Sequence, residues 1–307
     1  MYIILDCDPG HDDAVALLLL GSDPVFDVLG ITTVAGNQTI EKTTKNALNV
    51  INWLGLPYKV YPGAKRPLRR PPVVCAEIHG ESGLDGFDFP EHGRTPEDLS
   101  AADFMVKAVL EAKEKVVIVT TGPMTNLATA LQKCPEMKKN IEKIVLMGGS
   151  IGAGNVTPAA EFNIHCDPEA AEICFTSGLP VYMIGLDVTR RALVTREVID
   201  RMAKIGGKAS VMFTALMEAF NRNQKAVFGL DGGPLHDPLT VASLIDPELL
   251  HFEFVNTEID TTDGCSAGRT NCDLPGFLKK APNSYVAVDV DVERFWQILE
   301  KAIAYYK

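Results

Sequence analysis

Four aspartates between a buried strand and a buried helix are the feature that most restricts how this chain can fold. They are Asp6, Asp8, Asp12 and Asp13. Apolar residues at 2–5 and 14–20 flank them, which predicts a strand over 2–6 and a helix over 12–21. A Pro-Gly pair supplies the turn between the two. The acids therefore lie at the carboxyl end of a strand, where open α/β sheets bind ligands.

So many like charges need a neutralising partner when they pack together. Carboxylates in one place either bind a cation or stay partly protonated. Every donor in this cluster is an oxygen, which favours a hard divalent cation. One aspartate alone would more often be a turn residue or a helix cap, but four together favour a metal-binding or catalytic site.

The overall charge argues against a nucleic-acid partner. The formal net charge of the 307 residues is −11, and no basic run is longer than the pairs Arg69-Arg70 and Arg190-Arg191. A protein that binds nucleic acid through phosphate contacts carries the opposite sign.

The seven cysteines and the hydropathy pattern point to a cytoplasmic protein. An odd count with no Cys-x-x-Cys pair indicates neither a disulfide framework nor a zinc site, so we expect free thiols in a reducing compartment. No secretory signal is expected, and no apolar run approaches the roughly 18–20 residues that span a bilayer, so no membrane partner is expected.

Strand-like and helix-like segments alternate along the chain, which predicts an α/β fold. We expect a single domain over residues 1–307, with a mostly parallel, open twisted sheet, a Rossmann-like core, helices on both faces and the active site at the carboxyl ends of the strands. The predicted strands are 2–6, 26–34, 58–61, 116–121, 143–148, 180–186, 252–259 and 285–290. The predicted helices are 12–21, 39–54, 98–113, 125–133, 168–177, 195–205, 208–224, 238–245 and 292–305.

Two irregular stretches and one repeated device complete this outline. Residues 62–97 form a loop long enough to be a lid or a binding loop, and residues 226–236 are rich in glycine and predicted to be mobile. Aspartate followed by proline occurs at Asp167, Asp237 and Asp246, and this pair suits the first residues of a helix.

Further polar residues follow other predicted strands. Asn37 after strand 26–34 is either a turn residue or a hydrogen-bond donor into the same crevice. The carbonyl of Thr121 after strand 116–121 suits calcium, the alternative being a plain turn capped by Thr125. Glu161 and Asn163 on an extended segment would face one way, toward a polyol ligand or on a solvated edge strand.

Three patterns are rejected or left open on spacing. The glycine-rich run 148–154 lacks the Gly-x-Gly-x-x-Gly spacing of a dinucleotide site. The segment around His79 resembles a serine nucleophile elbow, but Leu84 stands where that motif requires glycine. The pair His236-Asp237 carries no signal of its own, because Asp237 matches the other Asp-Pro pairs.

Taken together, these motifs resemble the inosine-uridine-preferring nucleoside hydrolase family over essentially the whole chain. The residues that carry the resemblance are the opening segment 6–13, Gly36-Asn37-Gln38-Thr39, His79-Gly80-Glu81-Ser82-Gly83, Met147-Gly148-Gly149, Ala160-Glu161-Phe162-Asn163 and His236-Asp237-Pro238. The resemblance implies an enzyme of nucleoside catabolism or pyrimidine salvage that cleaves the N-glycosidic bond of ribonucleosides. It also implies Ca²⁺ and a homo-oligomer, either a dimer or a tetramer.

The resemblance further implies roles for individual residues. The metal would be held by Asp8, Asp13, Asp237 and the carbonyl of Thr121, with Asp6 supporting them from behind. The ribose would contact Asp12, Asn37, Asn155, Glu161 and Asn163, with Met147 beneath it. The base would lie near His79 and His236. A water on Ca²⁺ would be activated by Asp8.

The chemistry of the reaction agrees with these roles. Ribosyl transfer passes through an oxocarbenium-like state, so carboxylates around the sugar stabilise the transition state more than the ground state. Asp8 is our candidate general base and His236 our candidate acid for the leaving base, since histidine titrates near neutral pH.

The resemblance implies that the segment before His236 faces the base, so this segment bears on substrate choice. Gln224 and Phe228 lie one helical turn apart, and Gln224 could read a pyrimidine edge, so we expect uridine and cytidine as substrates with inosine as a further candidate. Pyrimidine-preferring relatives often carry a tyrosine at the aromatic position, and Phe228 has no hydroxyl to donate. The alternative for Phe220 and Phe228 is core packing.

Two other functions fit parts of the pattern. An aspartyl-nucleophile phosphatase also places Asp-x-Asp after its first strand, but it wants threonine or valine where this chain has Gly10. A non-catalytic calcium- or nucleoside-binding protein would use the same polar residues without turnover.

Overall fold

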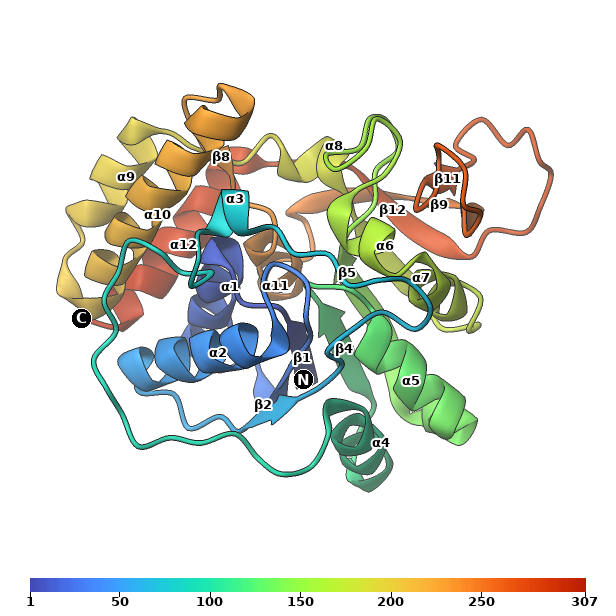
Figure 1. Ribbon diagram of the computed structural model, residues 1–307, viewed down its shortest axis with the longest axis horizontal. Helices are drawn as coiled ribbons and strands as arrows, with labels where there is room; N and C mark the ends of the chain where they lie inside the picture. The colour runs from blue at the N-terminus through green and yellow to red at the C-terminus, as the bar shows by residue number, and fades with distance from the viewer.

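An eight-stranded sheet organises the fold in the computed structural model, which describes residues 1–307 (Figure 1). Its strand order is β3-β2-β1-β4-β5-β6-β12-β9, and every neighbouring pair is parallel except β12 and β9. The strands are β1 (Tyr2–Cys7), β2 (Asp27–Thr33), β3 (Val60–Pro62), β4 (Val116–Thr120), β5 (Ile141–Met147), β6 (Val181–Ile184), β9 (Leu250–Val255) and β12 (Ser284–Val290). The predicted α/β fold with a mostly parallel sheet is confirmed.

Helices cover both faces of this sheet and create two separate cores. Alternate side chains of β1 enter different cores, with Ile3 and Leu5 in one and Ile4 in the other, because successive side chains of a strand point to opposite faces. One core includes α1 (His11–Ser22), α2 (Ile40–Leu54), α9 (Arg196–Ala203), α10 (Gly207–Phe228), α11 (Pro238–Ile245) and α12 (Val292–Tyr305). The other includes α4 (Ala101–Glu111), α5 (Thr125–Lys133) and α7 (Pro168–Phe175).

The remaining elements are short and connect the sheet to the site. They are the helices α3 (Ala76–His79), α6 (Phe162–Cys166) and α8 (Leu186–Thr189), the 3₁₀ helix η1 (Pro135–Asn140), and the strands β7 (Leu193–Val194), β8 (Gly233–Pro234), β10 (Thr257–Ile259) and β11 (Thr270–Cys272). Runs of two to six residues give too little periodicity to be recognised in the sequence.

The predicted strand over 252–259 is two strands. β9 pairs with β12 at the edge of the main sheet, whereas β10 pairs with β11 in a separate antiparallel hairpin. The break falls at Asn256, and the backbone N–H of Thr257 donates to the side chain of Asn283 instead of to a strand. The apolar pattern over 252–259 is continuous, but the chain changes its pairing partner from β12 to β11 within it, and the sequence alone does not show this change.

Helix α10 is one turn longer than the predicted helix 208–224. It reaches Phe228 and ends where Gly229 adopts a positive φ of 71°, the left-handed conformation that glycine readily takes at a helix end. The extra turn carries residues that were assigned to a mobile stretch, and it turns Phe228 toward the site described below.

Only one of the three Asp-Pro pairs is a helix cap. The carboxylate of Asp167 accepts a hydrogen bond from the backbone N–H of Ala170 at the start of α7. Asp237 precedes α11 but makes no capping bond, because its side chain faces the other aspartates. No helix follows Asp246, whose carboxylate accepts from the N–H of Glu248 in a turn. Thr125 is no cap either, since its hydroxyl donates to Asp167.

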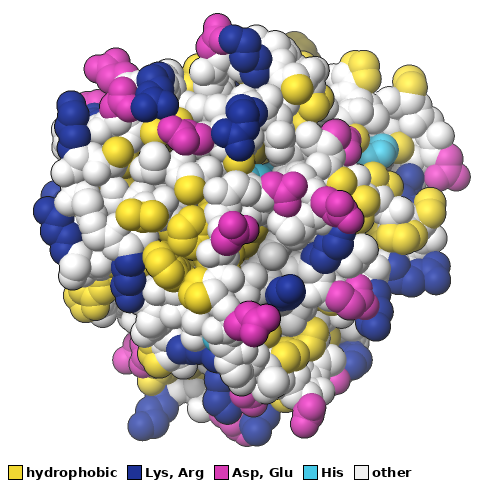
Figure 2. Space-filling view, turned by 60° about the vertical axis from the view of Figure 1, so that its left-hand side comes forward, with side chains coloured by type: hydrophobic (Ala, Val, Ile, Leu, Met, Phe, Trp, Pro, Cys, Tyr) yellow, Lys and Arg dark blue, Asp and Glu magenta, His cyan; other side chains and the backbone are white.

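The long segment 62–97 is irregular apart from α3, as predicted. It is nevertheless tied to the body of the protein, because the guanidinium of Arg70 forms a paired ion contact with Glu169, and the N–H of Leu68 donates to Asp167. No helix combines the length and the apolar composition needed to cross a membrane. On the face shown in Figure 2, basic and acidic side chains are interspersed, so no basic patch is seen there.

Candidate active site

A pocket of about 670 Å³ lies over the carboxyl ends of β1, β2, β4 and β5. It brings together twelve of the residues singled out in the sequence, and Asp6, Asp8 and Asp13 lie buried next to it. The twelve are Asp12, Asn37, His79, Thr121, Met147, Asn155, Glu161, Asn163, Gln224, Phe228, His236 and Asp237.

Carboxylates from two distant parts of the chain meet at the floor of this pocket. Oxygen atoms of Asp12, Asp13 and Asp237 all lie within 4.8 Å of one another, and all three residues are buried. Asp12 and Asp13 come from the first turn of α1, and Asp237 comes from the residue before α11. The helices α1 and α11 pack side by side, which is why residues more than 220 positions apart share one site.

Asp8 adjoins this trio but is held differently. One carboxylate oxygen, Oδ2, accepts a hydrogen bond of 2.7 Å from the backbone N–H of Asn37, whereas Oδ1 is buried without a partner. The backbone closes on Asp8 from two sides: a Cβ atom on Gly36 would lie 2.2 Å from Oδ2, and one on Gly122 would lie 2.5 Å from Oδ1. These two glycines are therefore required for the loops to approach the carboxylate.

The other aspartates are oriented by neutral donors. Asp6 accepts from the hydroxyl of Thr32 at 2.7 Å and from the amide of Asn126 at 2.8 Å. Asp13 accepts from the N–H of Gly10 at 2.9 Å and from the hydroxyl of Thr121 at 2.7 Å. No lysine or arginine pairs with any of these carboxylates, so their charges are not balanced within the protein.

Burial raises the pKa of every acid in the cluster. For Asp6 the pKa rises to about 6, and for Asp12 burial and the nearby Asp13 raise it to about 7. Burial followed by the charge of Asp13 raises the pKa of Asp8 well above its usual range, and burial followed by Asp12 does the same for Asp237. Negative charge is unfavourable here unless a cation is bound.

The cluster therefore fits a divalent metal ion. The buried oxygens Asp8 Oδ1 and Asp12 Oδ1 have no hydrogen-bond partner, and all the donors are oxygens, the type that hard cations prefer. Thr121 lines the same pocket, and its carbonyl accepts from the side-chain amide of Asn163 at 2.9 Å. A carbonyl oxygen has a second lone pair for another partner.

The wall after β5 is built around Glu161, and the prediction for this segment was wrong. Glu161 is the residue before α6, not part of an extended strand, and its carboxylate accepts from the N–H groups of Gly149, Asn163 and Ile164 at 2.9–3.2 Å. Both Glu161 and Asn163 are buried, so a solvated edge strand is excluded. Burial raises the pKa of Glu161 to about 7.

Two further residues of this wall are tied to backbone. The amide of Asn163 also donates to the carbonyl of Met147 at 3.1 Å, and the carbonyl oxygen of the Asn155 side chain accepts from the N–H of Phe162 at 2.9 Å. Polar atoms on this side are thus preorganised by the turn that leads into α6, a geometry that suits the hydroxyls of a small polyol.

Two histidines also line the pocket, and burial favours the neutral form of both. Burial lowers the pKa of His79 well below its usual range, and burial together with the charge of Arg190 lowers the pKa of His236 to about 3. His236 Nδ1 lies 2.7 Å from the hydroxyl of Thr189. The expectation that His236 titrates near neutral pH is therefore replaced by a neutral imidazole with one N–H, because the ring is desolvated and the positive charge of Arg190 is close.

Helix α10 supplies the remainder of this side. Phe220 is in the core, as one reading of the sequence held, but it also lines the pocket and packs against the ring of His79 at 5.9 Å between centroids. Gln224 is 4% exposed, and Phe228 is 50% exposed at the mouth, so core packing does not explain Phe228. The mouth carries exposed apolar side chains from four segments: Val73, Val74, Val156, Leu193, Val227, Phe228 and Leu230.

The sequence reasoning missed several residues that shape the pocket. Arg190 lines it and donates to the carbonyls of Ala153 and Gly154, which holds the glycine-rich loop in place. His11 lies directly behind His79. Its place inside the opening motif was the only available signal, whereas nothing in the sequence distinguishes Arg190 from an ordinary surface arginine.

Comparisons with known proteins find relatives over almost the whole chain. Residues 3–297 match the family described as inosine-uridine preferring nucleoside hydrolase. The pyrimidine-specific ribonucleoside hydrolase RihB of Escherichia coli is 42% identical over 99% of this chain and 97% of its own length. The purine-preferring ribonucleoside hydrolase from Gardnerella vaginalis superposes with a TM-score of 0.92 at 38% identity, covering 99% of this chain and 98% of its own. A plant nucleoside hydrolase, PpNRh1, superposes with a TM-score of 0.91 at 31% identity and the same coverage.

Proposed function

The chain belongs to the inosine-uridine preferring nucleoside hydrolase family and is a ribonucleoside hydrolase, and from this premise we propose that uridine and cytidine are its preferred substrates. Because the chain belongs to this family, we set aside an aspartyl-nucleophile phosphatase and a non-catalytic binding protein. Inosine remains a further candidate. The observation that carries the proposal is a pocket whose lining brings a cluster of buried carboxylates together with two neutral histidines and a buried glutamine.

The carboxylates suit the sugar. As the bond between C1′ and the base nitrogen lengthens, positive charge develops on the ribosyl ring, and nearby carboxylates lower the energy of that state. We propose that Asp12, Asn37, Asn155, Glu161 and Asn163 bind the ribose, with Met147 beneath it. The hydrogen bonds of Asn155, Glu161 and Asn163 to the backbone support this role, because groups held in place lose little entropy when the sugar binds.

The attacking water needs a base, and we assign this role to Asp8. Oδ1 is free to take a proton, while Oδ2 is held by the N–H of Asn37. A new bond forms between the water oxygen and C1′, the bond from C1′ to the base breaks, and the electron pair leaves with the base. One proton of the water passes to Asp8 Oδ1.

The leaving base needs a proton or a hydrogen bond, and we assign this role to His236. The hydroxyl of Thr189 can donate to Nδ1, which leaves the N–H on Nε2 for the pocket. Phe228 lies at the mouth and can cover the base but cannot donate. The pair of histidines therefore replaces the tyrosine that the resemblance associates with pyrimidine-preferring relatives.

We propose that the metal is Ca²⁺, held by Asp8, Asp13, Asp237 and the carbonyl of Thr121, with Asp6 behind them. Bound calcium would neutralise the acids, orient a water and the sugar hydroxyls, and lower the pKa of that water. Asp12 lies in the same group of oxygens and would connect the metal to the ribose. Calorimetric titration of metal-free protein should show one tight calcium site, and Asp13→Asn should weaken it.

The pyrimidine preference rests on Gln224 and on similarity. A buried carboxamide offers one donor and one acceptor group, which matches the edge of uracil or cytosine. The pyrimidine-specific relative from Escherichia coli is more similar in sequence than the purine-preferring one from Gardnerella vaginalis.

A nucleoside panel tests the proposal. Release of free ribose should be measured with uridine, cytidine, inosine and adenosine, with 2′-deoxyuridine as the control that lacks one sugar hydroxyl. We expect the highest kcat/KM for uridine or cytidine and a large loss for the deoxy control. A higher kcat/KM for inosine would refute the pyrimidine preference, and an absence of ribose release from every ribonucleoside would refute the proposed substrates altogether.

We also propose that residues 1–307 act as one domain and that the protein is a homodimer or homotetramer. Phe254 on the edge strand β9, and Phe277 and Leu278 in the loop between β11 and β12, are exposed, and exposed apolar side chains favour association. Light scattering during size-exclusion chromatography would give the mass in solution, and a monomer would contradict this proposal.

A further inference from the structure

A chain of contacts connects the loop 80–85 with His79 through His11. Nε2 of His11 lies 2.8 Å from the carbonyl oxygen of Asp85, and Nδ1 of His11 lies 3.3 Å from Nδ1 of His79. His11 is fully buried and does not line the active pocket, whereas His79 does. In this structure His11 contacts His79, which lines the pocket, and does not line the pocket itself.

The contacts restrict the ring of His11. A carbonyl oxygen only accepts, so Nε2 of His11 donates in the bond to Asp85, and this bond sets the plane of the ring. The other nitrogen then faces His79, whose ring stacks on that of His11 with centroids 5.5 Å apart. Phe220 packs against both rings, at 5.4 Å from His11 and 5.9 Å from His79.

The backbone at Gly10 packs against the other side of His79 and further restricts its ring. A Cβ atom on Gly10 would lie 2.5 Å from Nδ1 of His79, so the ring rests directly against the turn before α1. The backbone N–H of His11 also points at this Nδ1, at 3.3 Å. Nδ1 of His79 accepts from this N–H, so the proton of the neutral ring is on Nε2, the nitrogen left for the pocket; the two Nδ1 atoms are then in a packing contact and do not hydrogen-bond.

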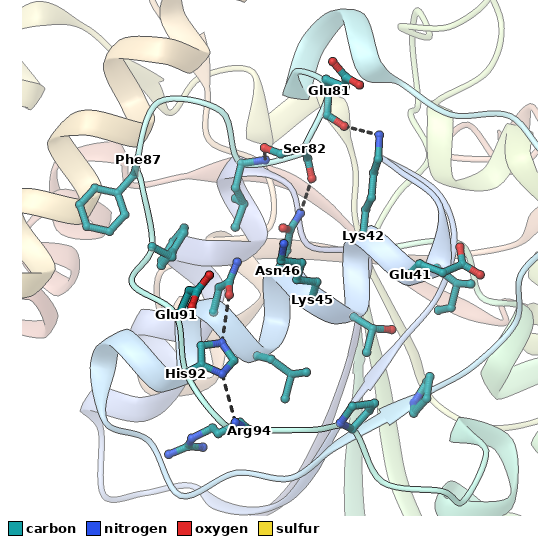
Figure 3. Close-up of a pocket in the computed structure, with 18 of the residues that line it drawn as sticks. Glu41, Lys42, Lys45, Asn46, Glu81, Ser82, Phe87, Glu91, His92 and Arg94 are labelled. Carbon is teal, nitrogen blue, oxygen red and sulfur yellow. Dashed lines mark hydrogen bonds between the residues drawn. The ribbon is translucent and has the colours of Figure 1, made fainter.

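The loop that holds His11 is itself anchored. The carboxylate of Asp85 accepts from the N–H groups of Glu81 and Ser82 at 3.1 and 3.0 Å, which closes the loop into a turn. Asn46 of α2 donates to the carbonyl of Ser82 at 2.9 Å, and Lys42 donates to the carbonyl of Glu81 (Figure 3). The carbonyl of Asp85 is therefore fixed relative to α2, on the wall of a second pocket that is separate from the active one.

We propose that His11 is a positioning residue for nucleoside hydrolysis: held by the carbonyl of Asp85, it keeps the imidazole of His79 turned so that Nε2 faces the nucleobase. This role rests on the proposed function, because His79 acts only when a base occupies that side of the pocket. A displacement of about 1 Å at such a group can cost on the order of 100-fold in rate.

Substrates with different leaving groups separate this role from damage to the nearby aspartates. His11→Phe keeps an aromatic ring and removes both nitrogens. With uridine, whose base needs help to leave, kcat should fall about 100-fold with little change in KM. With p-nitrophenyl β-D-ribofuranoside, whose phenolate leaves without a proton, the rate should stay that of the wild type.

His92→Phe is the matched control. His92 is a second histidine that anchors the irregular segment 62–97, since its Nε2 lies 3.0 Å from the side chain of Asn49 in α2, but it lines the second pocket (Figure 3). This variant should hydrolyse both substrates as the wild type does. His11→Gln, which keeps an N–H for the carbonyl of Asp85, should recover part of the uridine rate.

A double variant tests whether His11 works through His79. His11→Phe combined with His79→Ala should be no slower with uridine than His79→Ala alone, since the two changes remove one shared function. A rate for His11→Phe equal to the wild type with uridine would overturn the role of His11. Equal losses with uridine and the nitrophenyl riboside would overturn it too, because they would place the damage at the aspartates. Wild-type protein that releases no ribose from any nucleoside would instead overturn the proposed function, and the role with it.

Discussion

Replacing Asp12 with asparagine should stabilise the protein without metal and weaken its stabilisation by calcium. Asp12 is buried beside Asp13 and Asp237 and has no basic partner. Burial first and Asp13 second raise its pKa from the ordinary 3.8 to about 7. Because the folded state holds this proton more tightly than the unfolded chain does, stability falls as the pH rises from about 4 to about 7.

The size of the effect follows from the two pKa values. Their difference corresponds to about 4 kcal/mol, at roughly 1.4 kcal/mol for each pKa unit. This is the destabilisation that ionised Asp12 imposes on the metal-free protein at pH 8, and asparagine removes it. We therefore expect Asp12→Asn to gain up to about 4 kcal/mol in EDTA at pH 8 and less than half of that at pH 5.

With calcium bound, the wild type should gain more stability than Asp12→Asn does. A ligand that binds only the folded state adds about 4 kcal/mol when its concentration is 1,000 times Kd. The wild type should gain this stabilisation, whereas the variant lacks one negative charge beside the metal and should gain less.

Urea unfolding followed by circular dichroism measures all of these free energies. The control is Asp103→Asn, since Asp103 is an exposed aspartate whose hydrogen bonds to Lys133 and Ser100 lower its pKa. It should change stability by no more than about 1 kcal/mol, in the destabilising direction, with or without calcium. If Asp12→Asn instead destabilised the metal-free protein by the same amount at pH 8 and pH 5, the reasoning would be refuted. Repulsion among the buried carboxylates would then not limit the stability of the metal-free protein.

Three further changes test other parts of the site. Asp8→Asn should keep the shape of the side chain and lower kcat by about 10²- to 10⁴-fold, measured as ribose release, and near-normal turnover would exclude Asp8 as the base. Phe228→Tyr places a hydroxyl at the mouth and should raise kcat for uridine if the proton supply limits the rate, so an unchanged kcat would show that the histidines suffice. When a ribose analogue binds, hydrogen exchange should slow in the segment 73–79, which contributes to the active pocket. It should stay unchanged in the segment 87–97, which contributes to the second pocket. The reverse pattern would contradict a lid at 73–79.

Much of the fold was predictable because its signals are local. The buried runs of β1 and β4 and the helices 125–133, 238–245 and 292–305 agree with the sequence prediction to within about a residue. Apolar periodicity and turn residues act over a few positions, so they survive without knowledge of the partners. Elements whose identity depends on a partner were missed: β10 leaves the main sheet for β11, and β7 and β8 exist only as a pair.

The candidate site shows the same division. Its residue types and their order along the chain, including Asp8, Asn37, Glu161 and Asp237, were visible in the sequence. Their hydrogen bonds were not, and the assignment of Glu161 to an extended segment failed because its carboxylate is used by the backbone of α6. The Asp-Pro pair also predicted a helix cap at Asp237, but its side chain makes no capping bond, since packing of α11 on α1 places it beside the other acids.

By itself, the sequence determined that oxygen donors would follow a buried strand and lead into a buried helix, because these preferences arise within a few residues. The tertiary structure decided which charges meet and which groups stay neutral. Asp237 joins Asp12 and Asp13 only in the folded chain, and the pKa of His236 falls to about 3 only when burial and Arg190 surround it. Distances and desolvation set these properties, and both depend on parts of the chain that the local pattern cannot specify.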